Sequence, residues 1–130
     1  MPSGSDTSNG ETLIFTCAGA AHCGQVANTA ALQLTRDGAG KIFCLAAMSA
    51  GIPDKLKRAR EAAIRIVIDG CDDRCARVTM EKAGLPVDAH LVVTDHGIEK
   101  MPAQPRITAD ASRISETICA QLAGMGIGQD

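Results

Sequence analysis

Cysteines are the residues of this chain whose type and spacing point to chemistry. Six of them occur in 130 residues: Cys17, Cys23, Cys44, Cys71, Cys75 and Cys119. In a secreted protein such a number predicts a disulfide framework, whereas in a reducing compartment it indicates metal binding or thiol chemistry. Cys71 and Cys75 follow a mostly β-branched run, 64–68, where a strand is expected to give way to a helix. Ligands of α/β proteins bind at such places, beyond the carboxyl ends of the strands.

The rest of the sequence predicts strands that alternate with helices. Four short apolar runs have the composition of buried strands, at 12–17, 41–46, 64–68 and 89–94. Helical periodicity begins near residues 23, 55, 73 and 110, and the segments 49–54 and 101–108 are expected to be irregular. This order predicts an α/β fold, a small doubly wound, Rossmann-like three-layer sandwich around a four-stranded parallel sheet in the order 2-1-3-4.

The predicted domain organisation is simple. We expect residues 1–11 to be a disordered tail, because they are polar and lack an apolar pattern. Residues 12–123 form a single α/β metal-binding domain in this interpretation, and the glycine-rich residues 124–130 form a flexible tail.

The predicted strand order brings cysteines together. Cys17, Cys44 and Cys71 each lie at or near the end of one of three adjacent parallel strands, and Cys75 follows in the next helix. Neighbouring strands are about 4.8 Å apart, and thiolates bound to one zinc ion at about 2.3 Å lie roughly 3.8 Å from one another. Two helix N-termini at the same edge also favour thiolates. The sequence therefore predicts a four-cysteine metal site, with zinc as the expected ion.

Cys23 is a further thiol close to this site. It lies near the start of the first predicted helix, where the partial positive charge lowers the pKa of a thiol. We expect it beside the metal and outside the ligand shell, either as a reactive thiol of lowered pKa or as a neutral thiol that packs in the loop. Cys119 lies in an apolar helical stripe and is interpreted as a core residue.

The histidines are accessory candidates. His22, next to Cys23, is a possible extra metal ligand, but a lone loop histidine is more often solvated. His96, in a loop that follows a strand, is a possible lining residue of the pocket, and His90 is interpreted as structural.

Acidic residues surround the Cys71 segment. Asp69 is expected to order the turn after its strand by accepting backbone hydrogen bonds. Asp72 or Asp73 is expected to cap the helix that follows.

Several segments together resemble the DGC domain family. They are Cys17-Ala18-Gly19, residues 24–28 (GQVAN), residues 40–46 (GKIFCLA), residues 67–71 (VIDGC) with Cys75, and residues 92–100 (VVTDHGIEK). The resemblance covers about residues 13–100, and the family is named for the Asp-Gly-Cys motif. It implies a zinc-binding protein with four cysteine ligands, here Cys17, Cys44, Cys71 and Cys75. It implies no particular reaction, and Cys23 departs from the apolar residue expected in relatives.

Composition argues against other classes of function. The net charge is −2, and Phe15 and Phe43 are the only aromatic residues, so the sequence offers no basic surface and no stacking platform for a nucleic acid. No apolar run is long enough to span a bilayer, and the polar N-terminus lacks a signal peptide, which makes the cytoplasm the expected location. Apart from a metal ion, no partner is indicated.

Three kinds of function remain open. A closed four-cysteine zinc shell has no free position, which favours a structural, sensing or carrier role. The same cysteines are suitable ligands for an iron–sulfur cluster. A thiol-dependent enzyme, such as a reductase or sulfur-transfer protein, would use Cys17 or Cys23 as nucleophile. The strand-Cys-loop-helix order is similar to that of low-molecular-weight phosphatases and arsenate reductases, but no arginine occurs between Cys17 and Arg36 to hold an oxyanion.

Overall fold

A four-stranded, all-parallel sheet forms the centre of the molecule. The computed structural model describes residues 10–127. The strands are β1 (Thr12–Thr16), β2 (Lys41–Ile42), β3 (Ile64–Asp69) and β4 (Ala89–Val92), in the order β2-β1-β3-β4. The predicted fold class, parallel pairing and strand order are therefore confirmed.

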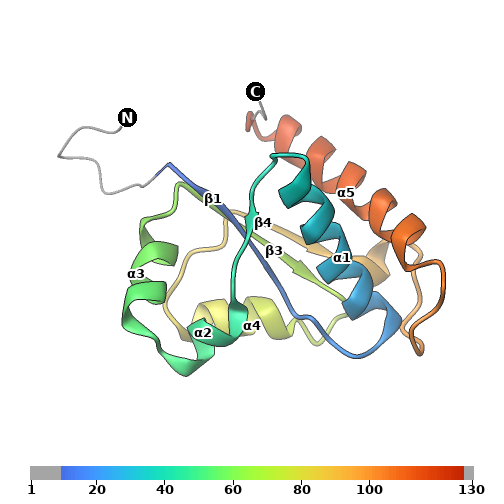
Figure 1. Cartoon of the computed structure of the whole chain (residues 1–130), viewed down its shortest axis with the longest axis horizontal. Coiled ribbons are helices and arrows are strands. Elements are labelled where there is room, and N and C mark those ends of the chain that lie inside the picture. Colours follow the sequence, from blue (N-terminus) through green and yellow to red (C-terminus); the bar gives the residue numbers. More distant parts are fainter. Residues whose placement is uncertain (1–9, 128–130) are drawn as a thin grey trace.

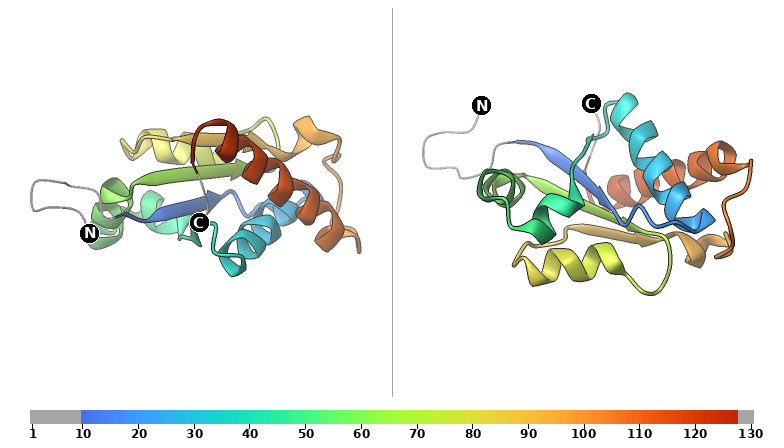
Figure 2. Two further views of the ribbon diagram at one scale, coloured as in Figure 1. Left: turned by 90° about the horizontal axis from the view of Figure 1, so that it is seen from above. Right: turned by 60° about the horizontal axis from the view of Figure 1, so that its bottom comes forward.

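Helices cover both faces of this sheet, as Figures 1 and 2 show. One layer holds α1 and α5, which pack against each other, and the opposite layer holds α2, α3 and α4. A short 3₁₀ helix, η1, follows β4 and leads toward α5. The helices are α1 (His22–Arg36), α2 (Leu45–Ala50), α3 (Pro53–Glu61), α4 (Cys75–Lys82), η1 (Val93–His96) and α5 (Ile107–Gly124).

The apolar core is divided by the sheet into two parts. Along β1, Ile14 faces α1 and α5, whereas Leu13 and Phe15 face the layer of α2, α3 and α4. Successive side chains of a strand point to opposite faces, so a strand covered on both sides must be apolar throughout. This explains why the middle of β1, residues 13–15, and the middle of β3, residues 66–68, are continuous apolar runs.

The segment after β2 differs from the prediction. The strand was expected over 41–46 and a loop over 49–54, but β2 ends at Ile42 and residues 45–50 form α2. β2 is an edge strand that pairs only with β1, and the sequence Leu-Ala-Ala-Met is rich in strong helix formers. Gly51, in a left-handed conformation, ends the helix. As a result, Cys44 lies at the N-cap of α2 and not within a strand.

The structure describes only part of the two expected tails. Residues 1–9 and 128–130 of the expected tails lie outside the described residues. Glu11, which was assigned to the N-terminal tail, accepts hydrogen bonds from the Arg58 guanidinium and, through its carbonyl, from the amides of Ala63 and Ile64. Within residues 10–127, no helix is long and apolar enough to cross a membrane.

Candidate functional site

A pocket lined by four cysteines lies at the carboxyl edge of the sheet. Cys17 directly follows β1, Cys71 follows β3 by two residues, and Cys75 is the first residue of α4. Together with Cys23 near the start of α1, they line a cavity of about 310 Å³, here called the thiol pocket. Its remaining wall consists of Gly19, Ala20, Ala21, Gly24, Gly70, Asp73 and Lys100. Three of the four predicted ligands therefore share one pocket.

Glycines allow the three segments of this pocket to touch. A Cβ atom added to Gly70 would lie 2.7 Å from the backbone nitrogen of Gly24, and one added to Gly24 would lie 2.6 Å from the carbonyl oxygen of Gly19. Such distances are shorter than van der Waals contact, so side chains are excluded from both positions. The Gly70 amide also donates a hydrogen bond of 3.3 Å to the sulfur of Cys17. The turn after β3 is thereby fixed against the end of β1.

Asp69 positions the helix that carries Cys75. Its carboxylate is 1% exposed and accepts hydrogen bonds from the backbone amides of Ala76, at 2.8 Å, and Arg77, at 3.2 Å. The expectation that Asp69 accepts backbone hydrogen bonds is confirmed, although the donors belong to α4. The first turn of α4 is consequently tied to the end of β3.

The predicted cap of this helix is wrong. Neither Asp72 nor Asp73 caps α4. The N-cap position is occupied by Arg74, in a left-handed conformation with φ of 53°, and its side chain forms no capping bond. The buried carboxylate of Asp69 already satisfies two of the free amides at this helix end, which is the task of a capping side chain.

His90 supports Asp69 from the neighbouring strand. Its Nε2 lies 2.8 Å from Oδ2 of Asp69, and the Arg77 guanidinium lies 3.2 Å from its Nδ1. A guanidinium only donates, so Nδ1 accepts and the proton is carried by Nε2, which donates to Asp69. The structural interpretation of His90 is therefore confirmed.

Lys100 contributes a positive charge to the thiol pocket. Its ammonium group pairs with Asp73 at 3.4 Å, and the proximity of the Cys71 thiol, followed by the charge of Asp73, raises the pKa of Lys100. Cys75 is exposed, and partial desolvation, followed by the charges of Asp73 and Cys17, raises the pKa of its thiol. Lys100 was not predicted as a site residue, because nothing in its sequence neighbourhood indicates that the segment before α5 returns to Cys71.

Cys23 is the inner wall of the pocket. Its side chain is 1% exposed, and burial, followed by the proximity of Cys71, raises the pKa of its thiol. Without a metal ion, desolvation of the Cys23 thiol outweighs the field of the helix N-terminus. The expected lowering of its pKa by a bound metal ion stays a prediction. The alternative, a neutral thiol that packs in place, describes the structure.

The histidine candidates lie away from the thiol pocket. His22 is the first residue of α1, is fully buried, and bonds through Nε2 to Asp110 at 2.7 Å. Its Nδ1 accepts a hydrogen bond from the Gln104 amide at 3.0 Å. The expectation of a solvated loop histidine is therefore wrong, because both ring nitrogens join α1 to the segment before α5. His96 ends η1 and does not line the thiol pocket.

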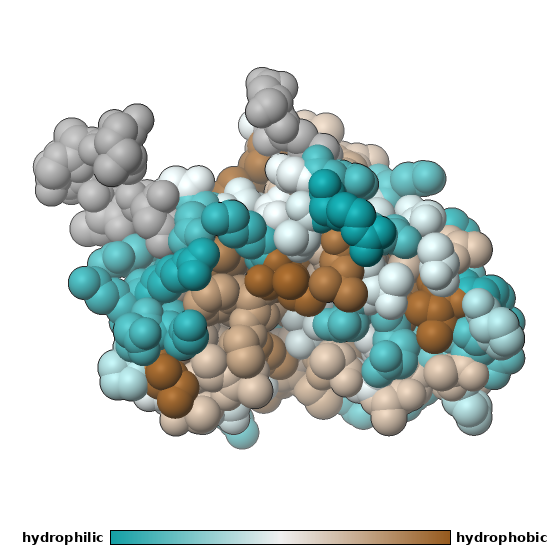
Figure 3. Space-filling model, viewed as in Figure 1, coloured by the Kyte–Doolittle hydropathy of each residue, from teal (hydrophilic) through white to brown (hydrophobic). Residues whose placement is uncertain are grey.

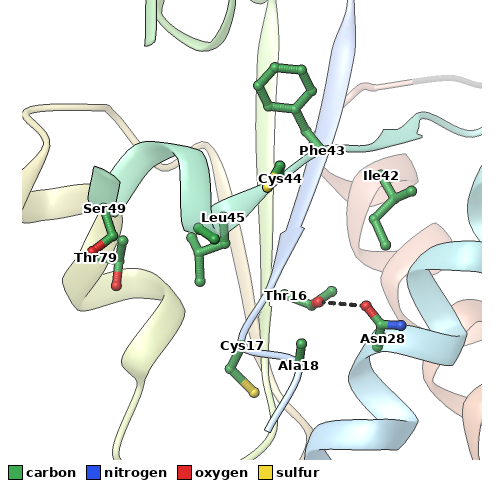
Figure 4. A pocket seen from close by; sticks show the side chains of 11 residues that line it. Thr16, Cys17, Ala18, Asn28, Ile42, Phe43, Cys44, Leu45, Ser49 and Thr79 are labelled. Carbon is green, nitrogen blue, oxygen red and sulfur yellow. Dashed lines mark hydrogen bonds between the residues drawn. The ribbon is translucent and has the colours of Figure 1, made fainter. Parts of the chain in front are cut away.

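Cys44 is the predicted ligand that the structure places elsewhere. It is exposed and lines a second pocket, on the other side of Cys17, together with Phe43. Figure 4 shows the sulfur of Cys17 directed away from Cys44. Cys119 lies in α5 and packs against the core, as expected.

The donor set of the site is that of a soft metal. Cysteine thiolates select zinc or iron–sulfur clusters, and Asp73 adds a carboxylate to the lining of this pocket. Among residues 10–127, no three histidine, cysteine or acidic side chains are already arranged to hold an ion. The cysteine sulfurs are therefore suitable ligands for a metal ion by type. In the described structure, however, they are placed as free thiols.

Comparison with known proteins adds a family match. A family model described as the DGC domain matches residues 13–121. Among curated proteins, the "Anaerobic and virulence modulator AnvM" of Pseudomonas aeruginosa is 28% identical over 102 residues, which cover 78% of this chain and 78% of that protein. No solved structure matches the chain. The range of the family match contains all four strands except Thr12, the first residue of β1, and every cysteine of both pockets.

Proposed function

The chain belongs to the DGC domain family, and on that premise we propose that it is a regulatory protein that binds one zinc ion through cysteines. The observation that carries the proposal is the shared pocket of Cys17, which follows β1, Cys71, which follows β3, and Cys75, which begins α4. The regulatory part is supported by the name of AnvM, which describes that similar protein as a modulator.

The proposed ligands are Cys17, Cys71, Cys75 and Cys44. The first three already line one cavity, and Cys44, in the loop in front of α2, lines the other cavity, which Cys17 also lines. A bound zinc ion would join the ends of β1 and β3 to the starts of α2 and α4. Cys23 is the competing fourth donor, because it lies within the thiol pocket but is buried.

A sensing or structural role follows from a closed shell. Zinc with four sulfur ligands has no position left for a substrate, so its chemistry is to hold the thiolates together and to release them on oxidation or chelation. Such a site works in a reducing compartment, and we therefore place the protein in the cytoplasm. An iron–sulfur cluster on the same cysteines is distinguished from zinc by its visible absorption.

One observation favours a second candidate, a thiol-dependent enzyme that uses Cys17. The Gly70 amide donates to the Cys17 sulfur, and a backbone donor of this kind stabilises a thiolate. Cys23 is a poorer nucleophile, because it is buried and the pKa of its thiol is raised.

The test is zinc content in a set of single variants. Protein purified without chelators is expected to carry about one zinc ion per chain, and Cys71→Ser and Cys75→Ser are expected to lose most of it. Cys44→Ser and Cys23→Ser identify the fourth ligand, since only the true ligand variant loses zinc. Cys119→Ser is the matched control, because Cys119 packs in the core away from both pockets. Zinc retained in the Cys71→Ser/Cys75→Ser double variant contradicts the proposal.

A further inference from the structure

A second cavity lies beside the thiol pocket and has a different character. It has a volume of about 520 Å³ and lies between the end of β1, the β2–α2 segment and the first half of α1. Figure 4 shows this cavity, here called the apolar pocket. Its lining residues include Cys17, Asn28, Ile42, Phe43, Leu45 and Ala46. Its size lies within the range of small-molecule sites.

The chemistry of the lining restricts what fits. Among residues 10–127, no aspartate, glutamate, lysine, arginine or histidine lines this cavity, although 22% of the chain is charged. Figure 3 shows the apolar surface gathered over the α2 and β2 side of this face, with the hydrophilic side chains of α3 beside it. A charged molecule would lose its hydration here and find no counter-ion. The occupant is therefore uncharged and mainly apolar.

The wall of the pocket is held in place from behind. The Phe43 ring packs edge-on against Phe15, with centroids 5.8 Å apart, and the Arg58 guanidinium lies 5.1 Å from its centroid. The Phe43 amide donates to the carbonyl of Ile14 at 2.8 Å. With both its ring and its backbone fixed, Phe43 does not need to be ordered when a ligand binds, and this lowers the entropic cost of binding.

Asn28 offers one polar contact. The Thr16 hydroxyl donates to its amide oxygen at 3.1 Å, which leaves the amide nitrogen as a donor. Within the described part of the chain, no acceptor takes a hydrogen bond from this nitrogen. Because no buried side-chain nitrogen or oxygen there lacks a partner, the Asn28 nitrogen is accessible. A carbonyl or ether oxygen on the ligand is the complementary group.

Cys17 forms part of both cavities. A molecule in the apolar pocket would contact Cys17, which also lines the thiol pocket, and would lie against Cys44. We propose that the apolar pocket binds a small, uncharged, mainly apolar molecule with a hydrogen-bond acceptor, and that this molecule is sensed through Cys17 and Cys44. This inference adds a ligand to the proposed zinc protein and does not depend on which ion is bound.

The experiment uses three probes of similar length: 2-heptanone, hexanoate and hexylammonium. Each is titrated into the full-length protein of measured zinc content, and amide shifts are followed by two-dimensional nuclear magnetic resonance. 2-Heptanone is expected to give saturable shifts at Asn28, Phe43 and Leu45. The charged probes are expected to bind with an affinity at least about tenfold lower, since burial of a charge costs more than 1.4 kcal/mol. Equal effects of the three probes, or no saturable shift, would overturn the proposal.

Variants on α2 test the location. Ala46 and Ser49 are exposed and line the pocket, whereas Ala50 is exposed on the same helix and does not line it. Ala46→Phe and Ser49→Phe are each expected to abolish the 2-heptanone shifts, and Ala50→Phe is the matched control that keeps them. Shifts that survive in both filling variants would place the binding elsewhere and refute the site.

The same titration separates other occupants and other failures. If the pocket resonances shift with protein concentration and without any probe, a second copy of the chain covers this surface, and the small-molecule proposal is overturned. Zinc content is measured on the same samples, so a chain that holds zinc but not 2-heptanone refutes only this inference.

Discussion

The carboxylate of Asp69 and the ring of His90 are joined by a hydrogen bond of 2.8 Å across the neighbouring strands β3 and β4. The same carboxylate accepts from the amides of Ala76 and Arg77 in the first turn of α4. One buried side chain therefore connects β4, β3 and the helix that begins with Cys75. Asp69, the aspartate of the Asp-Gly-Cys motif, therefore positions Cys75 through α4. Cys71, the cysteine of the motif itself, lies two residues after Asp69.

Asp69→Ala is expected to destabilise the domain by about 2–4 kcal/mol, because two amides and the His90 ring lose their buried acceptor. The measurement is the free energy of unfolding from urea titration. Asp72→Asn is the matched control in the same loop, since the Asp72 side chain is 79% exposed and its loss should change stability by less than about 0.5 kcal/mol. If the two variants are equally stable, Asp69 does not hold α4.

Gly70→Ala is expected to cost about 1–3 kcal/mol and to move the Cys71 turn away from Cys17. The added Cβ would lie 2.7 Å from the backbone of Gly24, which cannot yield as a flexible side chain does. Gly124→Ala is the control: a Cβ there meets nothing within 4 Å, and alanine is the better helix former. The measurement is again the free energy of unfolding from urea titration. If this free energy is the same in Gly70→Ala as in the parent, the close contact with Gly24 does not require glycine.

Sequence reasoning predicted the sheet and the cysteines that line the thiol pocket. Apolar runs that alternate with helices fixed the parallel pairing and the order of strands, and this order brought Cys17 and Cys71 to one edge. The prediction failed for β2, where two residues of pairing at an edge could not outweigh strong helix formers. This displaced Cys44 from the expected convergence.

Contacts between distant segments could not be predicted. His22 and Asp110 are 88 positions apart, and no local pattern links them. The pairing of His90 with Asp69 depends on the register between β3 and β4, which a sequence does not specify to one residue. The burial of Cys23 could not be predicted for the same reason, because it results from segments distant in sequence that pack together.

Acid is expected to weaken the domain partly through Asp110. The hydrogen bond from His22 and the charge of Arg106 hold the pKa of Asp110 below its ordinary value of 3.8. A carboxylate with a lowered pKa in the folded state contributes stability that is complete above the unfolded pKa and is lost as the pH falls through the folded one. Asp110→Asn should therefore be less stable than the parent near neutral pH, and the difference should shrink below about pH 4.

The measurement for Asp110 is the free energy of unfolding at several pH values. Asp54→Asn is a suitable control, because Asp54 is exposed in the first turn of α3. A difference between parent and Asp110→Asn that stays constant from neutral to acidic pH would contradict this assignment.

The cysteines are expected to react with an alkylating reagent in the order of their exposure. In metal-free protein, the exposed Cys44 should be modified early and Cys23 last, because Cys23 is 1% exposed and its pKa is raised by burial. Time-resolved mass spectrometry of peptides gives the order. Modification of Cys23 as fast as Cys44 would mean that the α1 end of the pocket opens readily.

X-ray absorption at the zinc edge tests the central proposal most directly, because it reports the atoms bound to the metal. On protein purified without chelators and carrying about one zinc ion, the account predicts a shell of about four sulfur atoms at about 2.3 Å. The spectrum of Cys119→Ser should be the same, and Cys71→Ser should lose the signal together with the metal. A chain purified free of zinc, or a shell dominated by nitrogen and oxygen, would contradict a zinc site built from cysteines.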